Sequence, residues 1–308
     1  MTWVSWRLQR TETLIAVGIF ALLVAFLVPT GIQMANLYHQ DGLAACISAN
    51  PSATCANAIG GFRDRFQSLL DLASWFNLVP GLVGVLLAAP FILDLERGTY
   101  RLAWTQSISR GRWLVGKLGL PVITACIVAG GMALLFSWWH APSAHIDGRL
   151  ESGNYDTAGI VVIGYTLFAL ALALTLGAVW GRAAASLTVA FVGYFAVRIL
   201  VDYSIRDHLV APLRATFHGA RQLAVLQNAR VISMVGTLHG RQIISGSGFS
   251  FGGPQKFAAP QMNNAVFHVV YQPQSQFWPL QLTETGLFVG LAAILIAVAA
   301  WWTQRRAA

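Results

Sequence analysis

Charged residues are scarce in this sequence, and their scarcity excludes an ordinary soluble domain. They make up 10% of the 308 residues, whereas 56% are hydrophobic and the mean hydropathy is +0.59. A soluble domain carries about 25% charged residues. Lysine is almost absent, because only Lys117 and Lys256 accompany the arginines, a bias typical of a GC-rich bacterial gene. The composition therefore predicts an integral protein of the bacterial plasma membrane.

Recognisable catalytic, nucleotide-binding and metal-binding motifs are also missing. The stretch 111–118, GRWLVGKL, has the glycine and lysine spacing of a phosphate-binding loop, but Leu118 stands where a hydroxyl should hold magnesium. Lys117 is interpreted as reaching the inner head groups. His140, His145 and Asp147 lie close together without a zinc-binding pattern, so we interpret them as surface polar residues. No catalytic residue, metal site or nucleic-acid partner is predicted, and the net charge of +8 is attributed to membrane topology.

Six apolar stretches are each long enough to cross a bilayer. Hydrocarbon about 30 Å thick requires roughly 20 helical residues. The predicted fold class is an all-α polytopic membrane protein whose six transmembrane helices cover 13–35, 72–93, 114–139, 158–180, 183–201 and 282–302. The predicted divisions are an interfacial helix at 1–12, the first five spans at 13–201, an outer loop at 202–281, and the last span with an inner tail at 282–308.

The basic residues predict the orientation. With both termini in the cytoplasm, ten of the 20 lysines and arginines lie in short inner segments, as the positive-inside rule requires. Arg63 and Arg65 oppose the rule, so the reverse orientation is disfavoured but stays open. The ten inner residues are Arg7, Arg10, Arg97, Arg101, Arg110, Arg112, Lys117, Arg182, Arg305 and Arg306.

The predicted outer segments contain two cysteines and two stretches with helical character. Cys46 and Cys55 lie in one loop, where an oxidising compartment allows a disulfide, the alternative being two free thiols. Phe62 and Phe66 recur at helical spacing and predict a short amphipathic helix before the second span. In the long loop, 209–234 is compatible with a helix, and the Gly- and Ser-rich residues that follow predict turns and short strands.

Ionisable residues inside the predicted spans are few. Arg198 lies near the outer end of the fifth span, where it can reach the interface or pair with Asp202. Charges at membrane depth mark ion or proton paths. Their scarcity argues against a proton-driven transporter, and the lack of converging polar residues argues against a membrane-embedded enzyme.

The polar loop 94–112, between the second and third spans, resembles a known family. Its Glu96, Gly98 and Thr99, followed by Leu102, Ser109, Arg110 and Lys117, are similar to the corresponding loop of ABC-2 type transporter permeases. The segment 271–286, YQPQSQFWPLQLTETG, is similar to one that precedes the last span in many bacterial permeases of this group. The resemblance extends to the six-span plan and the long last outer loop.

The resemblance implies the membrane subunit of an ATP-binding cassette exporter. In such permeases the loop docks into a separate cytoplasmic ATPase, which carries ATP and magnesium, so this chain needs no cofactor. The expected partners are that ATPase, a second permease copy or a related permease, and membrane lipid. The residues expected to couple the loop to the ATPase are Asp94, Glu96, Arg97, Gly98, Thr99, Tyr100, Arg101, Trp104, Ser109 and Arg110.

Substrate is expected to pass between two permease subunits. Trp75, Phe76 and Asn77 on the second span, with Phe191 and Tyr194 on the fifth, are candidates to line that path because they combine apolar surface with polar contacts. The alternatives are a regulatory or structural membrane protein without transport activity and, as a weaker reading, a membrane-embedded enzyme.

Overall fold

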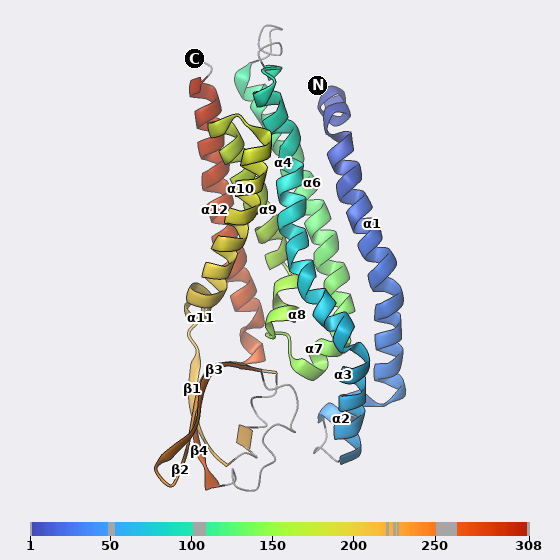
Figure 1. Cartoon of the computed structure of the whole chain (residues 1–308), viewed down its shortest axis with the longest axis vertical. Helices are drawn as coiled ribbons and strands as arrows, with labels where there is room; N and C mark the ends of the chain where they lie inside the picture. Colours follow the sequence, from blue (N-terminus) through green and yellow to red (C-terminus); the bar gives the residue numbers. More distant parts are fainter. Residues whose placement is uncertain are drawn as a thin grey trace.

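The computed structural model is a bundle of long helices with a small sheet at one end (Figure 1). It describes residues 2–48, 53–100, 109–219, 222–223, 226, 228–250 and 264–306. Both termini lie at one end of the bundle, here named the terminal end, and the sheet lies at the opposite end, here named the sheet end. The long helices are α1 (Thr2–Gln40), α3 (Ala53–Ser74), α4 (Leu78–Glu96), α6 (Arg110–Trp139), α9 (Val161–Trp180), α10 (Ala183–Leu200) and α12 (Phe277–Arg306).

Short helices complete the bundle, mostly at the sheet end (Figure 1). They are α2 (Leu43–Ser48), η1 (Trp75–Asn77), α7 (Ala141–Asp147), α8 (Ser152–Thr157), η2 (Val201–Ile205), α11 (Arg206–Leu209) and η6 (Gln274–Gln276). Because η1 follows α3 directly and leads into α4, the chain enters the second span without a turn.

Six segments of the described chain are long and apolar enough to cross a membrane. They are Val17–Gln40, Asn57–Glu96, Gly111–Trp139, Val161–Trp180, Ala183–Leu209 and Gln274–Arg305. The predicted six-span polytopic fold is confirmed. Residues 2–12, expected to lie in the interface, continue into α1 without a break, and their interfacial position stays a prediction.

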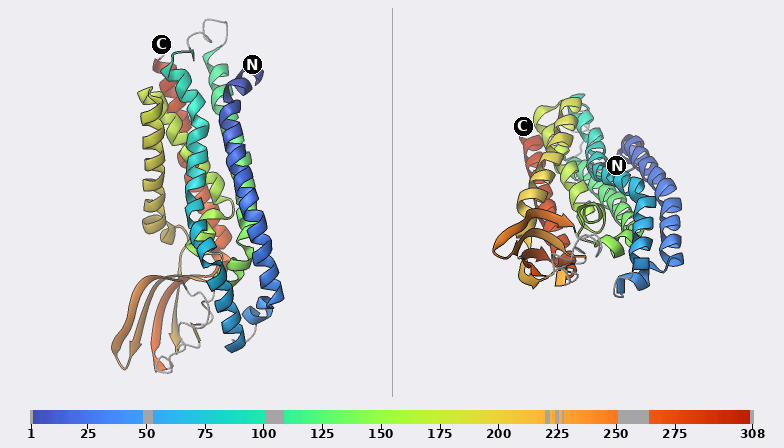
Figure 2. Two further views of the ribbon diagram at one scale, coloured as in Figure 1. Left: turned by 45° about the vertical axis from the view of Figure 1, so that its right-hand side comes forward. Right: turned by 60° about the horizontal axis from the view of Figure 1, so that its bottom comes forward.

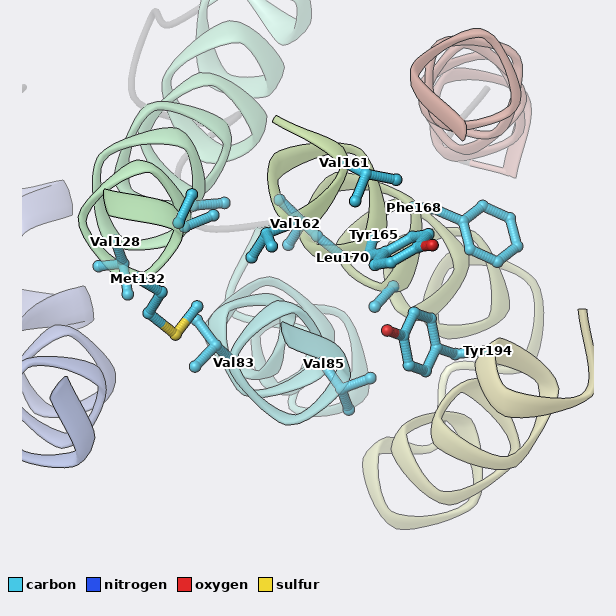
Figure 3. Packing of buried hydrophobic residues seen from close by; sticks show 14 of the residues in the cluster. Val83, Val85, Val128, Met132, Val161, Val162, Tyr165, Phe168, Leu170 and Tyr194 are labelled. Carbon is cyan, nitrogen blue, oxygen red and sulfur yellow. The ribbon is translucent and has the colours of Figure 1, made fainter. Parts of the chain in front are cut away.

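Helix α9 lies at the centre of the bundle and contacts α4, α6, α10 and α12. Figure 3 shows side chains from α4, α6, α9 and α10 meeting between these helices, Tyr165 and Tyr194 among them. The approach of α4 to α9 depends on small residues. A Cβ atom at Gly84 would lie 2.4 Å from the backbone oxygen of Thr166, and one at Gly177 would lie 2.4 Å from Ile92. Small residues allow helix backbones to approach closely where lipid supplies no hydrophobic drive.

Four antiparallel strands form the sheet, in the order β1-β4-β2-β3. They are β1 (Leu213–His218), β2 (Arg230–Leu238), β3 (Arg241–Ser250) and β4 (Val266–Gln272). β2 and β3 form a hairpin with the two-residue loop His239–Gly240, and both residues have positive φ, as a type I′ turn requires. Phe217, Met234 and Phe267 contribute to its own small core. Figure 2 shows the sheet projecting from the bundle, away from both termini.

The helix expected over 209–234 is wrong. Helix α11 ends at Leu209, Pro212 follows, and the chain then forms β1 and β2. Proline has no N–H donor and disfavours helix in the residue before it. In β2, Val231 and Met234 are buried in the small core of the sheet. The helical interpretation did not take this core into account.

Two predictions about the segment before the second span are confirmed. Cys46 and Cys55 form a disulfide that links α2 to α3. The amphipathic helix is the central part of α3, where Phe62 and Phe66 are buried and Arg63 forms an ion pair with Asp147 in α7. The segment is therefore held by a covalent bond at its start and by an ion pair further along.

Candidate functional site

The 94–112 loop begins with a defined helix end at Gly98. Gly98 has φ +71°, its N–H donates to the Leu95 oxygen at 3.3 Å, and the Thr99 N–H donates to the Asp94 oxygen at 3.1 Å. This pair of bonds is the Schellman motif, which needs a left-handed residue that glycine adopts without strain. Gly98 therefore ends α4 and turns the chain into the loop.

Two carboxylates join this helix end to neighbouring spans. Asp94 forms an ion pair with Lys117 in α6 and accepts a hydrogen bond from the Thr99 hydroxyl at 3.0 Å. Glu96 accepts a hydrogen bond from the Ala183 N–H at 2.9 Å, at the first turn of α10, where a negative charge is favourable. Because of these contacts, the start of the loop is fixed to α4, α6 and α10. Lys117 pairs within the protein, so its interpretation as a head-group contact is wrong.

The other residues expected to couple the loop are placed as follows. Arg97 is exposed, and the half-buried Tyr100 ring lies 6.5 Å from that of Trp113. Ser109 precedes α6 with an extended backbone and Arg110 is the first residue of that helix. Arg101 and Trp104 lie outside the described residues.

The five residues expected to line a substrate path occupy different environments. Trp75 is 66% exposed, whereas Tyr194 is fully buried. The ring centroids of Phe191 and Phe195 are 5.0 Å apart. The ring of Phe76 packs inside the bundle, with its centroid 5.3 Å from that of Phe136. Arg198 donates to the backbone and side-chain oxygens of Asn77 at 3.0 and 3.2 Å. Asn77 and Tyr194 approach the same arginine-containing region, whereas Trp75 faces outward. Their role in a path stays a prediction.

A buried cluster of charges lies at the sheet end, where the sequence interpretation expected few. Arg206 is its centre and its side chain is fully buried. Its Nε lies 2.9 Å from Glu284 Oε2, its Nη2 lies 2.6 Å from Asp156 Oδ1, and its Nη1 pairs with Asp202. Arg198 Nη2 lies 3.1 Å from Asp156 Oδ2. We name Asp156, Arg198, Asp202, Arg206 and Glu284 the ionic cluster.

Two tyrosines complete the ionic cluster. The hydroxyls of Tyr155 and Tyr165 donate to the two oxygens of Glu284 at 3.0 and 2.6 Å. The Arg206 guanidinium also lies 4.6 Å from the Tyr155 ring centroid, and that of Arg198 lies 4.5 Å from the Tyr165 ring centroid. Buried charges are tolerated when they are paired and hydrogen-bonded. The cluster therefore joins α8, α9, α10, α11 and α12 into one unit.

Burial and the charges of the ionic cluster shift the pKa values of two residues in α8, Asp156 and Tyr155. Burial raises the pKa of Asp156, but the guanidiniums of Arg206 and Arg198 outweigh it, so the pKa is lowered overall and Asp156 stays ionised. Burial, followed by the negative charge of Glu284, raises the pKa of Tyr155, which therefore remains a donor. Both effects preserve the pairing of carboxylates with cations and hydroxyls.

The same region anchors the sheet to the bundle. The chain leaves for the sheet after α11, which contains Arg206, and returns into α12, which contains Glu284. Beside this ion pair, the side-chain amides of Gln272 and Gln276 donate to the oxygens of Val210 and Ala211 at 3.2 and 3.1 Å. The two connections are thus held together immediately next to the membrane-spanning helices.

The ionic cluster corrects the expectation that polar residues do not converge at membrane depth. Arg206 and Glu284 belong to two candidate spans. Of the cluster, the sequence interpretation singled out only Arg198 and Asp202, as mutual partners. It named neither Asp156 nor Glu284, although Glu284 lies in the 271–286 motif. A charge within an apolar span was the available signal, since such a charge requires a partner. The buried Gln281 of this motif accepts from the Val161 N–H at 3.0 Å, at the start of α9.

His140, His145 and Asp147 do not form a common site. His140 is buried and contacts the Thr157 hydroxyl at 3.0 Å, which corrects its interpretation as a surface residue. Asp147 pairs with Arg63, and His145 lies beside Tyr38, with ring centroids 6.0 Å apart.

Lowering the pH is expected to destabilise the protein through His140. Burial lowers the pKa of His140 to about 4, below the ordinary value of 6.5. The unfolded state therefore binds more protons between these two values, and stability is lost as the pH falls from 6.5 toward 4, by up to roughly 3 kcal/mol. Thermal unfolding of detergent-purified protein between pH 7.5 and 4.5 measures this loss.

The matched variants for this pH prediction are His140→Gln and, as a control, His208→Gln at an exposed position. His140→Gln should flatten the profile between pH 6.5 and 4.5, and His208→Gln should leave it unchanged. Parallel profiles for the natural protein and His140→Gln would contradict the assignment.

The comparison with protein families decides the classification. Residues 17–206 match the family described as ABC-2 membrane transporter related, which is more than half of the chain. The chain belongs to this family. No curated protein and no solved structure gives a match.

Membership in the ABC-2 membrane transporter related family makes the chain a multi-pass membrane component of a transport system. The matched region includes four of the candidate spans in full and most of a fifth, together with the 94–112 loop and the ionic cluster except Glu284. The sheet and α12 follow it. In this family, an ABC ATPase is the general partner of the membrane component.

Proposed function

We propose that this chain is the permease subunit of an ATP-binding cassette exporter and that its terminal end faces the cytoplasm. ATP and magnesium then belong to a separate ATPase that docks on the 94–112 loop. Two copies of the chain, or one copy and a related permease, enclose the substrate path. Family membership supports the transport class, and the excess of arginine in the short loops supports the orientation.

The main support for the proposal is the attachment of the 94–112 loop to three spans. Gly98 ends α4, Asp94 pairs with Lys117 in α6, and Glu96 bonds to the first residue of α10. A force applied to the loop by a docked protein therefore reaches α4, α6 and α10 through short polar contacts. Such coupling changes the equilibrium between inward-open and outward-open states only if the ATPase binds the two states with different affinity.

We propose different roles for the loop residues, some in docking and others in force transmission. Arg97 is exposed and available to a partner, whereas Glu96 bonds to α10 within the same chain. We expect Arg97→Glu and Trp104→Ala to reduce association with the ATPase by about tenfold, as for interface anchors. Glu96→Gln should leave association intact but lower permease-stimulated ATP hydrolysis, because the amide is a weaker partner for the Ala183 N–H.

Co-purification of the permease with the ATPase, followed by ATP hydrolysis in proteoliposomes, tests these expectations. Arg305→Glu is the matched control, since Arg305 is exposed near the C-terminus at the same end of the bundle. Association reduced equally by Arg97→Glu and Arg305→Glu would indicate general electrostatic attraction and contradict docking. A permease that never stimulates the ATPase would favour a regulatory or structural membrane protein.

A further inference from the structure

A cavity of about 510 Å³ lies at the sheet end, apart from the ionic cluster and the 94–112 loop. It is lined by residues of α6, α7, α8, the start of α9 and the start of α12. Leu134, Ile163 and Phe277 give it apolar walls, and His140 and Arg149 are polar groups on its lining. Its volume is within the range of about 300–1,000 Å³ typical of small-molecule sites.

The mouth of the cavity lies on the lipid-facing surface. Leu134 is 76% exposed and Trp278 is 54% exposed, and both belong to candidate spans. Trp138, also on α6, is 46% exposed. Tryptophan side chains concentrate where hydrocarbon meets the head groups. The cavity therefore opens sideways at head-group level, with its apolar wall toward the hydrocarbon.

His140 presents a hydrogen-bond acceptor that has no partner. The Thr157 hydroxyl donates its single proton to the Gly153 oxygen at 2.8 Å, so it accepts a bond from His140 Nε2–H at 3.0 Å. Nδ1 is consequently the unprotonated nitrogen. It is buried and meets hydrogen-bond geometry with no group in the described part of the chain, although the Asn154 side chain, which donates to the Gly148 oxygen at 3.0 Å, lies near enough to act on the imidazole. A buried acceptor left unpaired costs free energy of about 1–3 kcal/mol, which a ligand donor would recover.

Arg149 supplies a positive charge beside the apolar wall. Its side chain is exposed and its guanidinium carbon lies 5.8 Å from the centroid of the Phe277 ring, also on the cavity wall. Among the described residues Arg149 forms no ion pair. An arginine at the membrane surface without an acidic partner attracts anionic head groups.

We propose that this cavity binds a lipid-like amphiphile whose acidic head group contacts Arg149 and whose hydroxyl donates to His140 Nδ1. The hydrocarbon part lies against Leu134, Ile163 and Trp278. The proposal requires the bundle to cross a bilayer but does not require an ATPase, so failure of the coupling experiment leaves it intact. A membrane lipid that stays bound and a transported amphiphile share this chemistry.

Binding of three lipids to the delipidated full chain, measured by native mass spectrometry, tests the proposal. Phosphatidylglycerol carries both the charge and hydroxyl donors, phosphatidylmethanol carries the charge alone, and phosphatidylcholine has no net charge and no donor. We expect phosphatidylglycerol to bind about fivefold tighter than phosphatidylmethanol, the worth of one hydrogen bond, and phosphatidylcholine to bind weakest. This series tests the acceptor without altering the buried His140.

The charge is tested with Arg149→Gln and its matched control Arg241→Gln. Both residues are exposed arginines, and Arg241 lies on the edge strand β3, outside the cavity. Arg149→Gln should weaken the binding of both anionic lipids about tenfold, while Arg241→Gln should leave the binding of both unchanged. Three results would each overturn the proposal. The three lipids could bind equally, the two substitutions could have equal effects, or no lipid could bind because a second copy covers the mouth.

Adding the ATPase and ATP distinguishes the two sources of ligand. A transported amphiphile should leave the cavity during turnover, so its occupancy falls, whereas a resident lipid should keep its occupancy. Both results support the site, and they differ in what the site does.

Discussion

Arg206→Ala is expected to destabilise the protein by about 3–5 kcal/mol, a large part of the stability of a typical domain. The substitution removes the cation that pairs with Glu284, Asp156 and Asp202, and the side chain of Glu284 is fully buried. It leaves buried carboxylates with too few partners. Urea-dependent or thermal unfolding of purified protein, read by tryptophan fluorescence, measures the loss.

Arg230→Ala is the control for this prediction. Arg230 also pairs with acidic residues, lying 3.0 Å from Asp207 and 4.0 Å from Asp202, but its side chain is 20% exposed. Water reaches these pairs in part, whereas it does not reach Arg206, so we expect a smaller loss of about 1–2 kcal/mol. The double variant Arg206→Ala with Glu284→Gln should be more stable than the sum of its single changes predicts, since it no longer buries an unpaired Glu284 charge. Additive losses would contradict direct pairing.

The membrane-spanning helices were predictable because each is encoded locally. About 20 consecutive apolar residues satisfy the thickness of the bilayer wherever they occur in the chain. The disulfide between Cys46 and Cys55 was predictable for the same reason, since both cysteines lie in one short loop. Gly98 was recognised as part of a motif, and the structure supplies its physical role, which is to end α4.

The ionic cluster was not predictable from local patterns. Arg206 is 50 residues from Asp156 and 78 residues from Glu284, and only the packing of α8, α11 and α12 brings the three together. Glu284 alone signalled that a partner must exist, without identifying it. The cluster also gives the 271–286 motif a structural role, because its Gln281 joins α12 to the start of α9 and its Glu284 joins α12 to α8.

The first half of the sheet was missed for a different reason, although short strands were predicted after residue 234, where β3 and β4 lie. The residues 213–218 and 230–238 contain apolar side chains at spacings that a short window cannot assign to helix or strand. Pro212 and the pair His239–Gly240 were the informative residues, since the first disfavours helix and the second forms the hairpin turn. Phe217 in β1 is paired with Phe267 in β4, and both side chains are buried in the small core of the sheet.

Gly84→Ala is expected to destabilise the bundle by about 1–3 kcal/mol, although alanine favours helix more than glycine does. The new Cβ atom would lie 2.4 Å from the Thr166 oxygen and 2.9 Å from the Leu170 nitrogen. Both are backbone atoms, which cannot rotate away as a side chain can, so α4 must separate from α9. Since α4 also carries Asp94 and Glu96, we expect the separation to weaken coupling through the 94–112 loop as well.

Gly119→Ala tests whether this loss comes from contact between helices. Gly119 also lies within a membrane-spanning helix, α6, but apart from its own helix backbone no atom of the described residues lies within 4 Å of the position its Cβ would take. There the helix preference of alanine should prevail, giving a gain of about 0.5–1 kcal/mol. The thermal midpoints of the two variants should therefore move in opposite directions. If both moved the same way, backbone preference rather than the approach of α4 to α9 would determine the stability of the bundle at Gly84.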